Sequence, residues 1–367
     1  MVRFGIEEEF MLLDPWRLSP VARAESLREE LAQDPVLGDY VHHEFLASQI
    51  EYSSPICTRL DEALSHLGGF RTALGSLSSR FDALAAGTGM PFDTGIDPPL
   101  TPDARYARVR SDIRAMVNDH QINAVHVHVE VADRDAGIRA LNGVRPWLPV
   151  LLALGANSPF WKGADTGFGS WRCLVLRRWG VAGVPPYFRD ADDYARRTQR
   201  LVRSGAILDL PTIAWGARLS ERYPTIEIRV FDAQLRAQDT VLLAALSRAL
   251  VATVTATRPT MSVPDHPGEL IDAALWLATR DGTSNGVFDA LSGDIVPARE
   301  AIAGLMTFIG DALDESGDRD EVDRQLQRML TEGTGAERQR AAHRSGGQPS
   351  LAALFSMTQE SEAQRTA

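Results

Sequence analysis

Four short segments of this chain carry acidic, imidazole or guanidinium side chains along one face of a predicted β-strand. They are FGIEEEFMLL at 4–13, QIEYS at 49–53, VHVHVEV at 125–131 and TIEIRVFD at 225–232. Successive side chains of a β-strand point to opposite faces, so residues two apart share a face. The spacing therefore predicts strands with one hydrocarbon face and one face rich in Glu, His and Arg, which is typical of a surface that binds a metal ion and phosphate.

The first segment carries three consecutive glutamates inside an apolar strand. Glu7 and Glu9 share one face, whereas Glu8 lies on the opposite face with Ile6 and Phe10. Three glutamates alone would favour a solvated edge strand, but the apolar flanks favour burial. Buried carboxylates require cationic or metal partners. We therefore expect Glu7 and Glu9 to take part in a metal site.

The third segment places His126, His128 and Glu130 on one face, with valines on the other. Two histidines at this spacing are metal ligands, contacts for substrate or phosphate, or an exposed pair without a ligand. Mg²⁺ and Mn²⁺ prefer oxygen ligands, and imidazole is a poor ligand for Mg²⁺. Beside Glu7 and Glu9, the histidines are therefore candidates for either metal or phosphate binding.

Guanidinium groups supply most of the positive charge. A single lysine stands among the 38 basic residues, so a phosphate or carboxylate clamp must use arginine or a metal ion. Glu227 and Arg229 share a strand face, where they form either an ion pair or part of a site. Arg172, with Arg177 and Arg178, is a candidate for bidentate binding of a carboxylate or phosphate.

Strands and helices that alternate along the chain must position these groups. Apolar residues at helical spacing predict helices at 60–86, 105–118, 133–154 and 237–258. The Gly-, Trp- and Arg-rich region 162–184 is expected to be an ordered substrate loop. Because the sequence has no obvious linker or repeat, residues 1–358 are expected to form a single catalytic domain, followed by a disordered tail at 359–367.

Composition narrows the class of protein. The chain has 367 residues, of which 44% are hydrophobic and 24% charged, as in globular proteins. A net charge of −11 argues against a general nucleic-acid binder. Cys57 and Cys173 are too few for a disulfide framework and indicate a reducing cytoplasm. Neither a signal peptide nor a membrane span is expected, so we predict a cytoplasmic protein without nucleic-acid or membrane partners.

Five motifs occur in an order that resembles one enzyme family. They are FGIEEEFMLLDP, HVHVEV, ANSPFW, the SWR segment and TIEIRVFDA, and the likeness extends from about residue 3 to the GAERQR segment at 335–340. The chain resembles the YbdK-like, type 2 branch of the glutamate–cysteine ligases, the carboxylate–amine ligases. The resemblance implies an α+β fold, with a glutamine-synthetase-like curved antiparallel β-sheet and helices packed on its outer face.

The resemblance also implies ATP, Mg²⁺ (with Mn²⁺ as the alternative ion), amino-acid substrates and self-association into a homo-oligomer. It assigns metal binding to Glu7, Glu9, Glu51 and Glu227. It assigns nucleotide binding to His126, His128 and Arg229. Catalytic roles fall to Arg229, Arg172 and Glu51, the two arginines meeting the substrate carboxylate or the transferring phosphoryl group.

In such a reaction ATP phosphorylates a carboxylate to an acyl phosphate, and an amine then displaces phosphate. The simplest case joins L-glutamate to L-cysteine to form γ-glutamylcysteine. Three motifs depart from the family pattern: Glu130 replaces a glycine, IEYSSP at 50–55 replaces a VELATP-like segment, and WRCL at 171–174 alters an SYRT-like one. Another amine or acid substrate is therefore an alternative, and a metal-dependent amidase or hydrolase is a further one.

Overall fold

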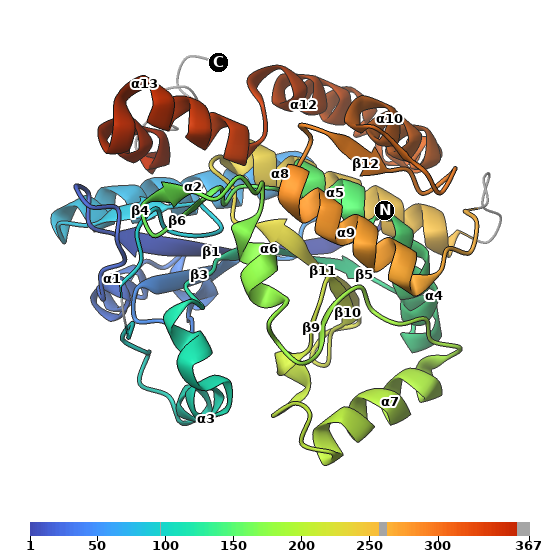
Figure 1. Cartoon of the computed structure of the whole chain (residues 1–367), viewed down its shortest axis with the longest axis horizontal. Coiled ribbons are helices and arrows are strands. Elements are labelled where there is room, and N and C mark those ends of the chain that lie inside the picture. The colour runs from blue at the N-terminus through green and yellow to red at the C-terminus, as the bar shows by residue number, and fades with distance from the viewer. Residues whose placement is uncertain (96, 257–262, 358–367) are drawn as a thin grey trace.

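An antiparallel β-sheet lies at the centre of the computed structural model, which describes residues 1–95, 97–256 and 263–357 (Figure 1). The strand order is β10-β11-β5-β1-β3-β2, and β4 pairs with the C-terminal end of β1. These strands are β1 (Phe4–Leu13), β2 (Val41–His43), β3 (Gln49–Ser53), β4 (Leu84–Ala86), β5 (Ala124–Glu130), β10 (Ala217–Leu219) and β11 (Thr225–Asp232). The strand with three consecutive glutamates is therefore central, not an edge strand.

Helices cover one face of the sheet, and a second helical layer lies outside them (Figure 1). The inner helices are α1 (Ala24–Leu31), α2 (Leu60–Arg80), α4 (Arg134–Val144), α5 (Leu148–Leu154) and α8 (Ala237–Thr255). The outer helices are α9 (Gly268–Asp281), α10 (Ala298–Phe308), α11 (Gly310–Ser316), α12 (Arg319–Glu332) and α13 (Gly335–Phe355). The predicted α+β architecture, an antiparallel sheet with helices on one face, is confirmed.

The opposite face of the sheet is bordered by shorter elements. They are α3 (Ala104–Ile113), α6 (Trp171–Leu176), α7 (Ala191–Arg203) and the two-residue strands β8 (Ala182–Gly183) and β9 (Ala214–Trp215). Two small hairpins, β6 (Phe160–Trp161) with β7 (Ala164–Asp165) and β12 (Gly286–Phe288) with β13 (Ile295–Pro297), lie outside the main sheet. In Figure 1, α3 and α7 project away from the helical layers.

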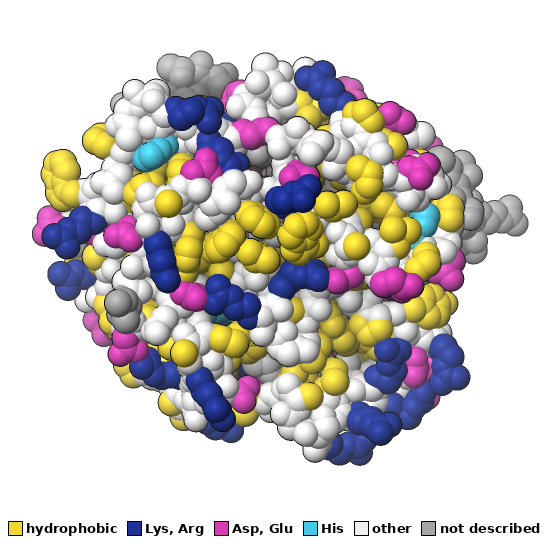
Figure 2. All heavy atoms as spheres, viewed as in Figure 1, with side chains coloured by type: hydrophobic (Ala, Val, Ile, Leu, Met, Phe, Trp, Pro, Cys, Tyr) yellow, Lys and Arg dark blue, Asp and Glu magenta, His cyan; other side chains and the backbone are white. Residues whose placement is uncertain are grey.

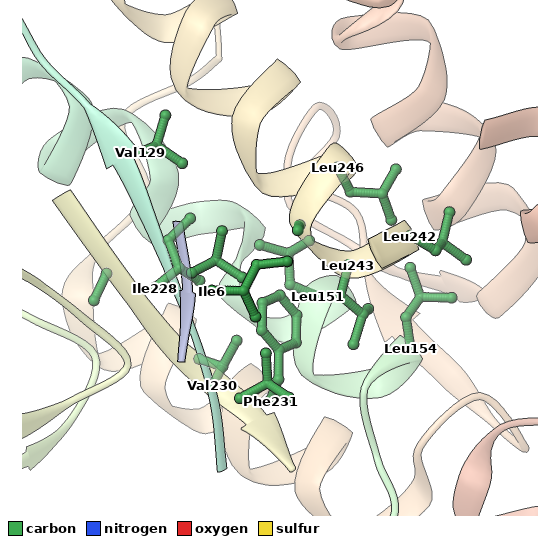
Figure 3. Packing of buried hydrophobic residues seen from close by; sticks show 14 of the residues in the cluster. Ile6, Val129, Leu151, Leu154, Ile228, Val230, Phe231, Leu242, Leu243 and Leu246 are labelled. Carbon is green, nitrogen blue, oxygen red and sulfur yellow. The ribbon is translucent and has the colours of Figure 1, made fainter. Parts of the chain in front are cut away.

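The hydrophobic core fills the space between the sheet and the inner helices. Ile6, Val127 and Ile228 lie opposite one another on three adjacent strands and are fully buried. Figure 3 shows side chains of this sheet face packed toward Leu151 of α5 and Leu243 of α8. Burial of each such side chain contributes about 1.5–3 kcal/mol, so the period-two pattern fixes which face the helices cover.

Helix α8 is long and rich in apolar residues. By length and composition alone, Ala237–Thr255 could cross a membrane, but 78% of its apolar window is buried inside the fold. Its apolar residues therefore serve the core.

Several predicted boundaries differ from the structure. The helix predicted over 60–86 ends at Arg80, because Asp82 adopts a positive φ of 53° and residues 84–86 join the sheet as β4. The predicted substrate loop contains α6, whose first turn is capped by the Ser170 side chain. The residues 257–258 of one predicted helix and the tail 359–367 lie outside the described residues.

Glu8 makes a buried ion pair beneath the central strand. Arg71 Nε of α2 donates to Glu8 Oε2 at 3.0 Å, and both side chains are fully buried. The same guanidinium donates to the carbonyl oxygens of Leu235 and Gln234 at 3.0 and 2.9 Å, and the Thr240 hydroxyl donates to Glu8 at 2.6 Å. The pair thus joins β1, α2 and the start of α8 through satisfied hydrogen bonds.

We expect Arg71→Met to lower the free energy of unfolding by about 3–5 kcal/mol, because it leaves the Glu8 carboxylate buried without its cation. Arg59→Met is the matched control, since Arg59 is exposed and its pair with Asp61 contributes about 1 kcal/mol or less. Denaturant unfolding of both variants measures the difference. Equal losses in the two variants would show that the buried pair does not stabilise the fold.

Candidate active site

Strand pairing brings the charged side chains of several strands to the sheet face opposite the inner helices. The directly opposed pairs are Glu7 with His126, Glu9 with Glu51, His128 with Glu227, Glu51 with His42, and Glu227 with Arg218. We call this set, together with Arg229, the polar face. All four segments singled out in the sequence contribute to it, so the structure brings together the strand residues predicted from the spacing.

Glu7, His126 and Glu227 form the first cluster of ligand-type atoms, which lie within 4.8 Å of one another. His126 Nδ1 lies 3.2 Å from Glu7 and 3.7 Å from Glu227, and His128 Nε2 lies 3.3 Å from Glu7. Burial tends to raise the pKa of Glu7, but hydrogen bonds from the two histidines outweigh it and lower the pKa. Burial and the Arg229 charge lower the pKa of His126 to about 4, which favours a neutral imidazole.

Two arginines neutralise Glu227. Arg218 Nε donates to Glu227 Oε2 at 2.7 Å, and Arg229 Nη1 donates to the other carboxylate oxygen. Burial alone would raise the pKa of Glu227, but the charges of Arg229 and Arg218 outweigh burial and hold the pKa well below its usual range. The ion pair that was one alternative for Glu227 and Arg229 is therefore present, and it lies within the polar face.

Glu9, Glu44 and Glu51 form the second cluster, again with ligand-type atoms within 4.8 Å of one another. The backbone N–H of Ala124 donates to Glu9 at 2.7 Å. Burial and the nearby Glu44 charge raise the pKa of Glu9 to about 8. Burial, followed by the charges of Glu7 and Glu44, raises the pKa of Glu51 well above its usual range. Three adjacent carboxylates with raised pKa values take up either protons or a cation.

Glu44 was missed in the sequence. It follows the short strand β2 and lies two residues from His42, which stands opposite Glu51. The segment HHEF offers an acid two residues after an imidazole, but only the pairing of β2 with β3 places that acid beside Glu9 and Glu51.

Arg172 and Arg229 line one cavity together with Glu9, Glu44 and His126. Arg172 Nη2 donates to the backbone oxygen of Arg229 at 3.3 Å. The Nε atoms of both arginines and Nε2 of His126 are buried and have no hydrogen-bond partner among the described residues. Buried donors of this kind are normally satisfied, and the Nε–H groups of the two arginines fit the oxygens of a carboxylate or phosphate.

Asp232, at the end of β11, anchors the segment that carries Arg172. Its carboxylate accepts hydrogen bonds from the Asn157 N–H and the Ser158 hydroxyl, both at 2.7 Å, and from the Ser170 hydroxyl at 2.8 Å. Ser158 Oγ in turn accepts from the Arg172 N–H at 3.0 Å, and Arg172 Nη1 lies 3.8 Å from Asp232. Asp232 closes the motif TIEIRVFD, but only the tertiary contacts identify it as a residue that positions Arg172.

Three predicted contributors lie elsewhere. Glu130 pairs with Arg3 at the exposed end of β5 and belongs to neither carboxylate cluster. Arg177 pairs with Asp272 and Arg178 with Asp119, so neither shares the cavity with Arg172. The alternation of side chains correctly predicted that Glu130 lies on the histidine face. Glu130 is the last residue of β5, however, and it lies away from both clusters.

The donor set of the polar face fits divalent metal and phosphate. Each cluster offers at least two carboxylate oxygens, the ligand type that Mg²⁺ and Mn²⁺ prefer. His126 adds a nitrogen to the first cluster, and its Nε2 is one of the buried unpaired atoms. Arginines on the same face supply phosphate contacts without lysine. The residues therefore fit Mg–ATP better than a structural zinc site, since cysteine is absent from both clusters.

Solved structures define the class of fold. Over the whole of this chain and 89% of its own length, a glutamate–cysteine ligase from Francisella tularensis, solved in complex with AMP, matches with a TM-score of 0.72 and 13% identity. A bifunctional glutathione synthetase from Pasteurella multocida matches 99% of this chain with a TM-score of 0.70 and 14% identity, over 52% of its own length. The chain therefore has the same fold as these two solved ligases.

Sequence comparison places the chain within that class. A protein of Saccharopolyspora erythraea with the provisional name glutamate–cysteine ligase 2-2 is 38% identical over 360 residues, which cover 96% of this chain and 91% of that protein. A similarly named protein of Nocardia farcinica is 36% identical and covers 91% of this chain and 87% of its own length. The sequence model of glutamate–cysteine ligase family 2 (GCS2) matches residues 3–356, and the chain belongs to this family of ATP-dependent carboxylate–amine ligases.

The raised pKa of Glu9 predicts how stability varies with pH. Between pH 6.5 and 8 the unfolded chain keeps Glu9 ionised, whereas the folded chain holds a proton on it up to about pH 8. Stability of the metal-free protein should therefore fall as the pH rises, by an amount on the order of 2 kcal/mol. Added Mg²⁺ or Mn²⁺ should reduce this fall, because a bound cation compensates the ionised carboxylates.

Denaturant unfolding at several pH values, with EDTA or with the divalent ion, tests this dependence. The window begins at the usual pKa of histidine, so the lowered pKa values of His126 and His120 add a small opposing slope at its lower end that fades as the pH rises. Glu9→Gln should show a shallower slope than the wild type. Equal slopes would contradict the assignment of a raised pKa to Glu9.

We expect Asp232→Asn to lower kcat/KM by roughly 10- to 100-fold, because the amide offers one acceptor oxygen where the carboxylate accepts from three donors and lies beside Arg172. Steady-state kinetics and thermal unfolding of the same variant separate lost positioning from lost stability. Asp61→Asn is the control, since Asp61 is exposed. Unchanged kinetics in Asp232→Asn would exclude the positioning role.

Proposed function

We propose that this chain uses ATP to activate an amino-acid carboxylate as an acyl phosphate and then joins it to an amine. The main observation in support of this proposal is that two carboxylate clusters lie beside Arg172 and Arg229 on one face of the sheet. The names of the relatives make glutamate the first acid to test and cysteine the simplest amine, with γ-glutamylcysteine as the product. Another acid or amine remains the alternative because motifs near Arg172 depart from the family pattern.

Divalent metal is part of this proposal, with Mg²⁺ first and Mn²⁺ as the alternative. Glu7, Glu9, Glu51 and Glu227, as assigned by the family resemblance, would hold it, and the geometry adds Glu44 and His126 as neighbours within ligand distance. When bound, the metal neutralises phosphate charge and orients the phosphoryl group for transfer. The raised pKa values of Glu9, Glu44 and Glu51 support this role, since adjacent buried carboxylates favour a cation.

The protein groups have distinct proposed roles. Arg172 and Arg229 bind the reacting carboxylate and the oxygens of the transferring phosphoryl group, where charge develops during transfer. His126 and His128, with Arg229, contact the nucleotide phosphates. Glu51 lies on β3, between the strand that carries Glu9 and the strand that precedes Glu44, and serves both metal binding and catalysis. A covalent protein nucleophile is not required, because phosphate is the leaving group.

This reaction uses elements from the whole described chain. Residues of β1, β3, β5, β11 and α6 meet at the polar face, and Gln339 of α13 donates to Asn157, which anchors to Asp232. We therefore propose that residues 1–358 act as one catalytic unit.

The direct experiment measures ADP release from purified protein with ATP, Mg²⁺ and glutamate, with and without each of a panel of amines. We expect amine-dependent ADP formation, and a Glu7→Gln, Glu9→Gln double variant should lower it by at least roughly 100-fold because it removes carboxylates from both clusters. Glu25→Gln, Glu30→Gln is the matched control, since both side chains are exposed.

Two outcomes would redirect the proposal. Equal rates in the double variant and its control would exclude the polar face as the site of phosphoryl transfer. Metal-dependent hydrolysis of γ-glutamyl amides without ADP formation would favour the amidase alternative over a ligase.

A further inference from the structure

Two kinds of residue line the cavity at the polar face. The cavity is about 140 Å³ in volume and opens between α3, α6 and the segment that leads into β9. The charged part of its lining, which we call the catalytic side, consists of Glu9, Glu44, His126, Arg172 and Arg229. The aromatic part consists of Phe45, Tyr106, His120 and Trp179, which we call the aromatic wall. In the view of Figure 2, the outline of the molecule is notched between the parts that contain α3 and α7.

The rings of the aromatic wall pack against one another. Phe45 contacts Tyr106 edge-on, with ring centroids 5.6 Å apart, and contacts His120 edge-on at 5.8 Å. His120 lies 5.2 Å from Trp179. Such geometry is typical of aromatic groups that stabilise one another, so the wall is a preformed surface.

The Trp179 N–H of the wall and the neighbouring Arg105 guanidinium are used within the protein. Trp179 Nε1 lies 3.4 Å from His120 Nδ1 and donates to it. Arg105, which also lines the cavity, makes a two-pronged pair with Asp209 at 2.7 and 3.0 Å. Burial, then the charges of Arg172 and Arg178, lower the pKa of His120 to about 4, so its ring is neutral near neutral pH. The surface that the wall presents is therefore largely hydrocarbon and aromatic.

The size of the cavity suits a single ring. A cavity of about 150 Å³ with apolar lining is large enough to admit benzene, and this cavity is of similar volume. A cysteine side chain would leave most of the wall uncovered, which forfeits apolar contact. Adenine would set its ring nitrogens and amino group against a wall in which the Trp179 N–H already donates to His120.

On this basis, and resting on the ligase function proposed above, we propose that the amine substrate carries an aromatic side group that packs on the aromatic wall. Its nitrogen then reaches the catalytic side of the same cavity. The amine nitrogen forms a C–N bond to the acyl carbon, the C–O bond to phosphate breaks with its electron pair on phosphate, and the amine loses a proton. The sum is carboxylate, amine and ATP giving amide, ADP and phosphate.

The first test compares amines in the ADP-release assay with ATP, Mg²⁺ and glutamate. The panel contains 2-phenylethylamine, L-phenylalanine, L-cysteine and L-alanine, so that the aromatic group is tested with and without an α-carboxylate. We expect kcat/KM for at least one aromatic amine to exceed that for cysteine and alanine by roughly 10-fold or more, the effect of filling an apolar pocket. Calorimetric titration of the same amines into the protein with Mg–ADP gives a readout independent of the acid.

The second test removes part of the wall. Trp179→Ala should raise KM for the preferred aromatic amine by roughly 10-fold or more and leave KM for ATP unchanged, and Trp179→Phe should restore most of the affinity. Trp16→Ala is the matched control, since Trp16 is 83% exposed and lies outside the cavity lining. Thermal unfolding of each variant confirms that the protein remains folded at the assay temperature.

The outcomes separate this inference from the ligase function. Ligase activity with cysteine equal to or better than both aromatic amines would overturn the aromatic substrate alone. A Trp179→Ala variant that raises KM for ATP and not for the amine would assign the wall to adenine and also overturn it. Absence of calorimetric binding of both aromatic amines would overturn the aromatic substrate alone, even where no ADP forms with glutamate and any amine.

Discussion

The structure depends on compensating glutamates that are removed from water. Glu7, Glu8 and Glu9 follow one another on the central strand, where burial disfavours their charged forms. Burial is compensated differently for each of them. Glu8 pairs with Arg71, Glu7 lies between two histidines, and Glu9 keeps a raised pKa beside other carboxylates. The strand is stable in the core because Glu8 is satisfied beneath the sheet, whereas Glu9 accepts a hydrogen bond from the Ala124 N–H but keeps a raised pKa.

The two carboxylate clusters are consequently in unlike electrostatic states. In the first, arginine and histidine already hold Glu7 and Glu227 in their ionised forms. In the second, Glu9 and Glu51 form no ion pair within the part of the chain that the structure describes, and their pKa values are raised. A cation entering the second cluster replaces protons, whereas one entering the first competes with the guanidinium groups of Arg218 and Arg229 for Glu227. Binding of a cation to the first cluster therefore depends on whether the two guanidinium groups stay paired with Glu227.

Local sequence pattern predicted the part of this site that depends on strand periodicity. The faces of Glu7, Glu9, His126 and Glu227 follow from alternation alone, and the structure brings them together. The architecture was predictable to the level of an antiparallel sheet with helices on one face, with the family resemblance supplying the topology. Helix ends were less predictable, because residues such as Asp82 leave the helix through a backbone conformation that apolar spacing does not encode.

The sequence pattern could not predict which distant residues contact the charged groups of the site in the folded chain. Arg71 is 63 residues from Glu8, and Asp232 joins residues 62 to 75 positions away. Glu44 gains its place only through the pairing of β2 with β3. Arg177 and Arg178 looked equivalent to Arg172, but a short helix turns them toward Asp272 and Asp119.

The ion pair between Glu8 and Arg71 also sets how this strand can evolve. Because side chains alternate, an inserted or deleted residue just before Glu7 would shift the register and exchange the two faces of β1. Glutamates would then face the helices where only one arginine is placed to meet them, and isoleucine or phenylalanine would occupy the polar face. Natural variation in β1 should therefore consist of substitutions at constant length, with changes in length confined to the loops that flank it.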